Sequence, residues 1–515
     1  MRIRKLLRVR FVVYSFTEQE KIMAELTPMM QKYMETKEQY KDCILFYRLG
    51  DFYEMFFDDA IVASKELEIA LTGKSCGLEE RAPMCGIPYH AVETYLARLV
   101  SRGYKVAICE QVEDPKLAKG LVKREVIRVV TPGTNLDVQS LEASKNNYLM
   151  CIAYTSDGIG ISAADVTTGD YYVTEVEDLR KLKDELMKYE PSEIICNEAF
   201  LVSGYDVEDL KSRLHMSVSS LESHMFDDDG CRRILMRHFK VNTLIGLGVE
   251  EFPTGILAAG ALLQYLYDTQ KTDLEHFTHI SPYLTSKYML LDSSTRRNLE
   301  LTETLREKQK RGSLLWVLDK TKTAMGGRLL RNYIEQPLID KEEMEKRLDA
   351  IQELNQDSIS RDEIREYLNP VYDLERLLSK VTYKTANPRD LIAFRNSLQM
   401  LPPIKTVLAG FQKEELAAIR EEIDGLEDIY QLIDEAIVEE PPISIREGGM
   451  IKDQFDETID HLRAAKHDGK QWLVQLEEED RERTGIKNLK IKKNNVFGYF
   501  FEVTNSYKDL VPEDY

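Results

Sequence analysis

The segment Gly50-Asp51-Phe52-Tyr53-Glu54 combines residue types and spacing that could perform chemistry. The spacing is typical of a helix start, because Asp51 can cap a following helix and Glu54, three residues later, completes a capping box. That arrangement would leave Phe52 at an exposed corner between a strand and a helix. An exposed apolar side chain on a rigid corner is suited to unstacking a DNA base step. The segment therefore predicts a helix cap, with a DNA wedge at Phe52 as the functional alternative.

Two glycine motifs suggest nucleotide binding, but their contexts argue against it. Gly73-Lys74-Ser75 matches the end of a phosphate-binding loop, yet Glu68 stands where the first glycine is required, and the motif follows a predicted helix. Gly158-Ile-Gly160 has Ala163 in place of the third glycine and lies in a predicted hairpin. We therefore predict no nucleotide-binding loop at either motif and interpret the second as turn chemistry.

Three acidic residues, Asp157, Asp165 and Asp170, raise the alternative of a metal-dependent nuclease. An RNase H-like sheet would have to bring its carboxylates together to hold two divalent ions. The first predicted strand, residues 148–154, carries no acid, so we favour turn and solvent-facing acids. The histidines are scattered and the cysteines form no Cys-x-x-Cys pair, so we predict neither metal ligands nor catalytic residues.

The elements around these motifs predict two α/β domains. Residues before about 138 combine helical patterns with alternating strands and end at the turn Thr131-Pro-Gly-Thr134. The predicted elements there are a helix at 27–39, strands at 43–48, 103–109 and 125–130, and a second helical pattern reaching Leu71. Residues 139–282 predict a β-meander followed by a helix and a strand, which is typical of an open mixed sheet. Its predicted elements are strands at 148–154, 158–165, 171–176 and 193–196 and a helix at 179–189.

Beyond Leu284 the sequence predicts an almost entirely helical region, because apolar residues recur at spacings of three and four. A long amphipathic helix is predicted from Ile451 to about Glu482. The period then changes to two, and residues 489–493 and 497–503 predict a β-hairpin. A basic cluster near this hairpin could contact phosphates or form a solvated face; its members are Lys487, Lys490, Lys492 and Lys493. A helical scaffold that binds only protein partners is a further alternative.

The charge of the chain argues against binding nucleic acid or anionic membranes by bulk attraction. The 515 residues carry 69 basic and 89 acidic side chains, a net charge of −20, although residues 1–138 are nearly neutral with 21 basic and 20 acidic residues. Any DNA contact must therefore be local. The length predicts about three or four domains. No apolar segment is long enough to span a membrane, and the seven cysteines predict reduced thiols in a cytoplasmic protein.

A series of longer motifs occurs in one order along the chain. They are Thr27-Pro-Met-Met-Gln31, Leu45-Phe-Tyr-Arg-Leu-Gly-Asp-Phe-Tyr-Glu54, Met84-Cys-Gly-Ile-Pro-Tyr-His-Ala-Val-Glu93, Cys109-Glu-Gln111, Lys119-Gly120, Thr131-Pro-Gly-Thr134, Pro388-Arg-Asp390 and Glu447-Gly-Gly-Met-Ile451. In these motifs the sequence closely resembles the bacterial MutS family of DNA mismatch repair proteins. The resemblance covers essentially everything after about residue 25.

The resemblance implies a multidomain fold of α/β and all-α parts. It comprises an unmatched basic leader at 1–22, a mixed α/β mismatch-recognition domain at 23–138, an RNase H-like connector at 139–282, a helical core and lever at 283–452, and a lever helix with a truncated β clamp at 453–515. By the resemblance, Phe52 matches a wedge that enters the minor groove beside a mispair, and Glu54 matches the residue that bonds the displaced base. The four lysines would contact the DNA backbone, and the expected ligand is double-stranded DNA with mismatches or small loops.

The sequence departs from the family pattern at three places. The family's C-terminal ATPase domain is absent, so we expect no enzymatic activity and no cofactor in this chain. ATP, Mg²⁺, homodimer formation and a MutL-type partner are expected only of a full-length relative. The leader has no match, and Met23 is an alternative start. Cys85 stands where a small apolar residue is usual, which we expect to affect only packing.

Overall fold

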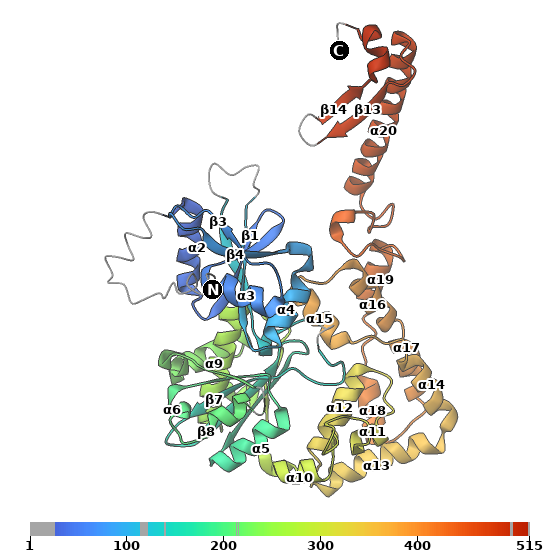
Figure 1. Ribbon diagram of the computed structural model, residues 1–515. Coiled ribbons are helices and arrows are strands. Elements are labelled where there is room, and N and C mark those ends of the chain that lie inside the picture. Colours follow the sequence, from blue (N-terminus) through green and yellow to red (C-terminus); the bar gives the residue numbers. More distant parts are fainter. Residues whose placement is uncertain are drawn as a thin grey trace. The chain divides into compact units, whose positions relative to one another are not determined.

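The computed structural model describes residues 26–113, 122–137, 141–212, 214, 216–494 and 498–512 (Figure 1). The chain divides into two compact units, which we describe separately. One comprises Met1–Ala386 and Asn396–Gly425, and the other comprises Asn387–Arg395 and Leu426–Tyr515. The predicted leader at 1–22, the alternative start at Met23 and the motif Lys119-Gly120 lie outside the described residues.

A six-stranded sheet in the order β3-β4-β2-β1-β5-β6 forms the first domain of the larger unit. Its strands are β1 (Cys43–Leu49), β2 (Phe52–Phe56), β3 (Thr72–Lys74), β4 (Ala82–Pro88), β5 (Lys105–Gln111) and β6 (Arg124–Val130), and its helices are α2 (Pro28–Gln39), α3 (Phe57–Leu67) and α4 (Val92–Val100). Helix α2 packs Met30 and Tyr33 on the face that carries Leu45 and Phe56. Helices α3 and α4 pack on the opposite face. The sheet is therefore covered on both sides, as a mixed α/β domain requires.

Phe52 begins strand β2, and the helix cap predicted at Asp51 and Glu54 is wrong. Strands β1 and β2 pair as an antiparallel hairpin, with Leu49 opposite Phe52. Helix α3 starts only at Phe57 and receives no side-chain cap. Residues 52–55 alternate between exposed or partly exposed and buried positions, which is the period of a strand, and Phe56 is buried. Gly50 supplies the turn, as predicted, with a φ of 59°.

A second six-stranded sheet, in the order β11-β10-β7-β8-β9-β12, confirms the predicted meander. The elements are β7 (Leu149–Tyr154), β8 (Ile159–Asp165), β9 (Asp170–Val176), α5 (Leu179–Tyr189), β10 (Glu193–Cys196), α6 (Glu198–Leu201), α7 (Val207–Ser212), β11 (Ser217–Ser220), α8 (Asp228–His238), α9 (Pro253–Gln270) and β12 (Ser281–Pro282). Strand β7 pairs antiparallel with β8 and parallel with β10, so the sheet is mixed. The main core lies between this sheet and helix α9.

Gly160 has a packing role, which corrects its interpretation as turn chemistry. Gly158 does occupy a turn, with a φ of 154°, but Gly160 lies within β8. A Cβ atom on Gly160 would lie 1.9 Å from the backbone oxygen of Thr254 and 2.7 Å from the nitrogen of Gly255. The absence of a side chain therefore lets the first turn of α9 approach the strand closely.

The remaining elements are mostly helical, as predicted. They are α10 (Ser293–Asn298), α11 (Leu314–Leu318), α12 (Ala324–Glu335), α13 (Lys341–Gln356), α14 (Ser358–Leu368), α15 (Leu374–Thr382), α16 (Pro388–Leu398), α17 (Leu401–Leu408), α18 (Glu414–Glu422), α19 (Glu427–Ala436), α20 (Glu457–Thr484) and the strands β13 (Lys490–Asn494) and β14 (Gly498–Glu502). The start predicted for the long helix is wrong, because α20 begins after Asp456, whose side chain accepts a hydrogen bond from the Ile459 amide at 2.9 Å. Ile451 instead forms a β-bridge with Ile437.

Two further sequence predictions can be compared with the described residues. All seven cysteines are free and buried. Burial raises the pKa of the Cys43, Cys85, Cys109, Cys196 and Cys231 thiols to about 12, so these groups are weak nucleophiles. Within the described ranges, no helix has the length and apolar character needed to cross a membrane.

Candidate nucleic-acid interface

The β1–β2 hairpin presents Phe52 at a fixed corner of the first sheet. The Phe52 side chain is 47% exposed, although every other described Phe or Tyr of this domain is buried or partly buried. The Tyr89 amide donates to the Asp51 carbonyl at 3.0 Å, and the Arg48 Nε donates to the Gly50 carbonyl at 2.6 Å. Both central residues of the turn are thus bonded to neighbouring structure, which restricts the direction in which Phe52 points.

A cation and two aromatic rings support this corner from the opposite face of the sheet. The Arg48 guanidinium lies 3.9 Å from the centroid of the Tyr89 ring and 5.5 Å from that of Tyr53. Arg48 also lies 3.4 Å from a carboxylate oxygen of Glu110, which accepts a hydrogen bond from the Tyr53 hydroxyl. Burial, followed by the hydrogen bond to Glu110, raises the pKa of Tyr53 above its ordinary value. The hydroxyl therefore remains a hydrogen-bond donor at neutral pH.

Glu54 lies on the same face of strand β2 as Phe52, because alternate residues of a strand share a face. Its neighbour on β1 is Tyr47, and its neighbour on β4 is Gly86, which has no side chain. Lys74 of the edge strand β3 reaches over β4, and its Nζ lies 2.6 Å from Glu54 Oε2. The structure thus brings together both residues predicted for the wedge and adds a cation that the prediction did not include.

The supporting residues could have been found in part from the sequence. Glu110, Gly86 and Tyr89 lie in motifs that carry the family resemblance. Lys74 was considered only as part of a phosphate-binding loop. Gly73 and Lys74 lie in the edge strand β3, which pairs antiparallel with β4, so they do not form a strand-to-helix loop.

The four predicted backbone-contacting lysines belong to the smaller unit, and all are exposed. They do not form one patch on the hairpin. Lys490 and Lys492 share a face with their cross-strand neighbours Glu502 and Phe500, whereas Lys493 pairs with Tyr499 on the other face. Lys492 forms an ion pair with Glu502 at 2.8 Å. Lys487 precedes the hairpin. Their contact with DNA stays a prediction, and the strand alternation shows that one flat surface cannot engage all four equally.

The three acids considered for a nuclease do not meet at one site, because Asp157 lies apart from Asp165 and Asp170. Asp157 is exposed in the turn before β8, and Asp165 ends the same strand. Seven strand residues separate the two turns, about 20 Å at the usual rise per residue. Asp165 is fully buried, which corrects its assignment as a solvent-facing acid. Within the described ranges, no group of three or more His, Cys, Asp or Glu residues is placed to hold a metal ion.

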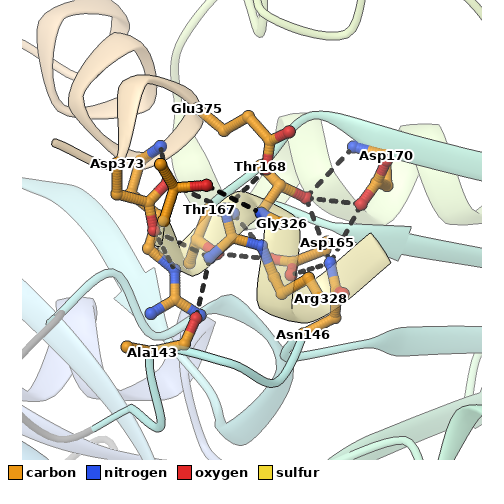
Figure 2. A network of polar contacts seen from close by, with 12 residues as sticks. Ala143, Asn146, Asp165, Thr167, Thr168, Asp170, Gly326, Arg328, Asp373 and Glu375 are labelled. Carbon is orange, nitrogen blue, oxygen red and sulfur yellow. Dashed lines mark hydrogen bonds and ion pairs between the residues drawn. The ribbon is translucent and has the colours of Figure 1, made fainter. Parts of the chain in front are cut away.

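Asp165 and Asp170 instead organise the β8–β9 turn (Figure 2). One oxygen of Asp165 accepts hydrogen bonds from the Thr167 amide and hydroxyl at 2.8 and 2.7 Å, and the other accepts from Asn146 and the Asn147 amide, both at 2.9 Å. Asn146 also donates to Asp170 at 2.9 Å. Burial, followed by the nearby Asp165 carboxylate, raises the pKa of Asp170. Both acids thus have structural partners.

Arg328 of α12 joins the segment before β7 to the start of α15 (Figure 2). Arg328 of α12 is 3% exposed and donates to both oxygens of Asp373 at 2.7 Å. It also donates to Glu375 at 2.6 Å and to the Ala143 carbonyl at 2.9 Å. Burial lowers the pKa of Arg328, but the hydrogen bonds and charges of the two acids outweigh burial and raise it overall. Arg328 is therefore a buried cation with hydrogen bonds from both terminal nitrogens.

The structure is that of a multidomain protein with α/β and helical parts. It contains an α/β domain with an exposed aromatic corner, an open mixed sheet, and a helical region that ends in a long helix and a hairpin. Family models match these parts in order: MutS domain I at residues 27–139, MutS domain II at 147–280 and MutS domain III at 294–510. The chain belongs to the MutS family.

Curated relatives extend the match over nearly the whole chain. DNA mismatch repair protein MutS of Lachnoclostridium phytofermentans is 65% identical over 493 residues, which cover 96% of this chain and 53% of the relative. The proteins of the same name from Ruminiclostridium cellulolyticum and Acetivibrio thermocellus are 54% and 53% identical, over 96% of this chain and 56% and 57% of their own lengths. The chain spans about half the length of these relatives.

Proposed function

We propose that this chain recognises mispaired or looped double-stranded DNA by inserting Phe52 beside the mispair. The observation that carries the proposal is the half-exposed Phe52 ring, held on a hydrogen-bonded hairpin corner next to Glu54. The family relationship supports it, because the matched relatives are DNA mismatch repair proteins. No observation in the described part of the chain favours the nuclease alternative.

The geometry suits a sensor of deformability. A mispaired step is poorly stacked, so it costs less to kink and unstack than a paired step does. Stacking of a base on an aromatic ring contributes roughly 1–3 kcal/mol and tolerates every base. Glu54 adds selectivity, because a carboxylate near phosphates is favourable only where a base offers it a hydrogen bond. Phe52 and Glu54 lie on one face of β2, so they can contact the same base step.

Further partners follow from the family relationship and belong to the same proposal. They are homodimer formation, a MutL-type repair partner, and ATP with Mg²⁺ bound by the full-length protein. We assign none of these to residues of this chain. We also propose a cytoplasmic location and backbone contacts by the exposed lysines at 487, 490, 492 and 493.

Phe52→Ala tests the proposal in the full-length protein. We expect its affinity for a G·T mispaired duplex to fall about tenfold or more while its affinity for the matched duplex changes little, because only the kinked complex stacks a base on the ring. Fluorescence anisotropy titrations of both duplexes measure the ratio. The matched control is Ile127→Ala, because Ile127 is 45% exposed on the edge strand β6, three strands away from β2 in the same sheet. Unchanged discrimination in Phe52→Ala would overturn the wedge assignment.

A further inference from the structure

The Glu54–Lys74 ion pair lies on the same face of the sheet as Phe52. Strand β4 is between β2 and β3, and the register places Glu54 opposite Gly86 and Lys74 opposite Ala82. Ala82 and Gly86 are four residues apart on β4 and therefore lie on the same face, so Lys74 and Glu54 lie on that face too. Lys74 spans the intervening strand to reach Glu54. A Cβ on Gly86 would lie 3.6 Å from Glu54 Cγ, an ordinary van der Waals contact, so glycine leaves room beside the carboxylate without being required for the ion pair.

Lys74 is held more firmly than an ordinary surface lysine. Its Nζ lies 5.6 Å from the centroid of the Phe56 ring as well as 2.6 Å from Glu54 Oε2. The side chains of Lys74 and Glu54 are only 34% and 16% exposed, so the pair is partly shielded from water. Shielding strengthens a charge pair relative to a fully solvated one. Phe56 itself is buried, and its ring packs edge-on against Tyr33 at 4.9 Å.

The pair leaves the two oxygens of the Glu54 carboxylate unequal. Oε2 accepts a hydrogen bond from Lys74 at 2.6 Å, whereas Oε1 accepts none from the described residues. A carboxylate is an acceptor only, so the remaining lone pairs can accept an N–H group but cannot donate to a base acceptor. Lys74 also neutralises the negative charge that would otherwise oppose the approach of phosphates.

We propose that Lys74 is a positioning and specificity-determining residue: it holds Glu54 Oε2 so that Oε1 is presented beside Phe52 to the N–H donor of a displaced base. The inference rests on the proposed function and adds the class of group recognised. In a matched pair, the N–H donors on the pairing edges are used by the partner base. The oriented carboxylate then gains no bond, which penalises the matched complex.

A double-mutant cycle tests this role through the ratio of mismatch to matched affinity. In the full-length protein, Lys74→Met is expected to lower the ratio for a G·T duplex about tenfold, the scale of one hydrogen bond to a charged group. Lys74→Arg should restore most of the ratio, because it keeps a cation within reach of Glu54. Adding Lys74→Met to Glu54→Gln should change the ratio by less than about twofold, since both substitutions remove the same interaction.

A matched control separates positioning from general attraction. Lys32→Met removes the same charge from α2, where Lys32 forms an exposed ion pair with Glu35 at 2.7 Å, and should leave the ratio unchanged. If Lys74 only contacted a phosphate, Lys74→Met would weaken binding to both duplexes equally, and the ratio would stay constant. That result, or full additivity with Glu54→Gln, would overturn the inference. The proposed function would fail separately if the unsubstituted protein bound both duplexes equally.

Discussion

Gly160→Ala is expected to destabilise the second sheet and α9 by about 3 kcal/mol or more. The new methyl group would lie 1.9 Å from the Thr254 oxygen and 2.2 Å from its carbonyl carbon. These are backbone atoms at the start of a helix, so no side-chain rotation can relieve the overlap. The helix must move away from the strand, which would open the core between β8 and α9.

Hydrogen exchange measured by mass spectrometry can detect this loss locally. Faster exchange is expected in residues 159–165 and 253–270, together with a lower midpoint of thermal unfolding. The control is Gly246→Ala, because a Cβ there meets open space and the position should be nearly neutral. Equal protection in Gly160→Ala and the parent would show that the close approach of α9 to β8 is wrong.

Arg328→Met is expected to cost about 3–5 kcal/mol, the scale for breaking a buried ion pair by removing one partner. Methionine fills similar space but leaves Asp373, whose side chain is 17% exposed, without its two short hydrogen bonds. It also releases the Ala143 carbonyl, which connects the segment before β7 to α12. We expect the loss to appear as faster exchange in residues 141–147 and 324–335.

A surface arginine provides the comparison for Arg328. Arg420 of α18 forms an ion pair with its exposed neighbour Glu421 at 2.8 Å, and Arg420→Met should change stability by less than about 1 kcal/mol. Arg328→Met combined with Asp373→Ala should be less damaging than the sum of the two single changes, because each removes the same interaction. Strict additivity would contradict the bonding in Figure 2.

Local pattern was sufficient to predict about half of the helices and strands of the α/β domains, and the terminal hairpin. It missed β2, β3 and β4 in the first domain and helices α8 and α9 in the second. It was insufficient at Asp51 and Glu54, because an acid followed three residues later by a glutamate fits a capping box and also fits the turn and first residues of a strand. Residues 52–56 show no clear alternation of polarity in the sequence either, because Glu54 is their only charged residue. The strand is defined by its pairing with β1 and β4, which a local pattern does not contain.

Local sequence motifs likewise located only some residues of the candidate site. Phe52 and Glu54 were found from motifs, but their partner Lys74 depends on the β3-β4-β2 order and register, which no local pattern contains. Asp165 was misassigned to solvent for the same reason: its burial depends partly on Asn146 and Asn147, which precede its strand by a full hairpin. The lysines at 487, 490, 492 and 493 were interpreted as one cluster, although the period of two predicted for residues 489–493 already places Lys490 and Lys492 on one face and Lys493 on the other.

The hydrogen-bonded turn beneath Phe52 has a kinetic consequence for the proposed function. The turn's carbonyls are bonded to Arg48 and Tyr89, so folding itself fixes the direction of the ring. A preformed probe loses little conformational entropy at each encounter with DNA. The protein could therefore test many successive base steps by brief contacts, without folding a loop at each one. The time that the protein spends at a base step would then depend on how readily the DNA unstacks at that step.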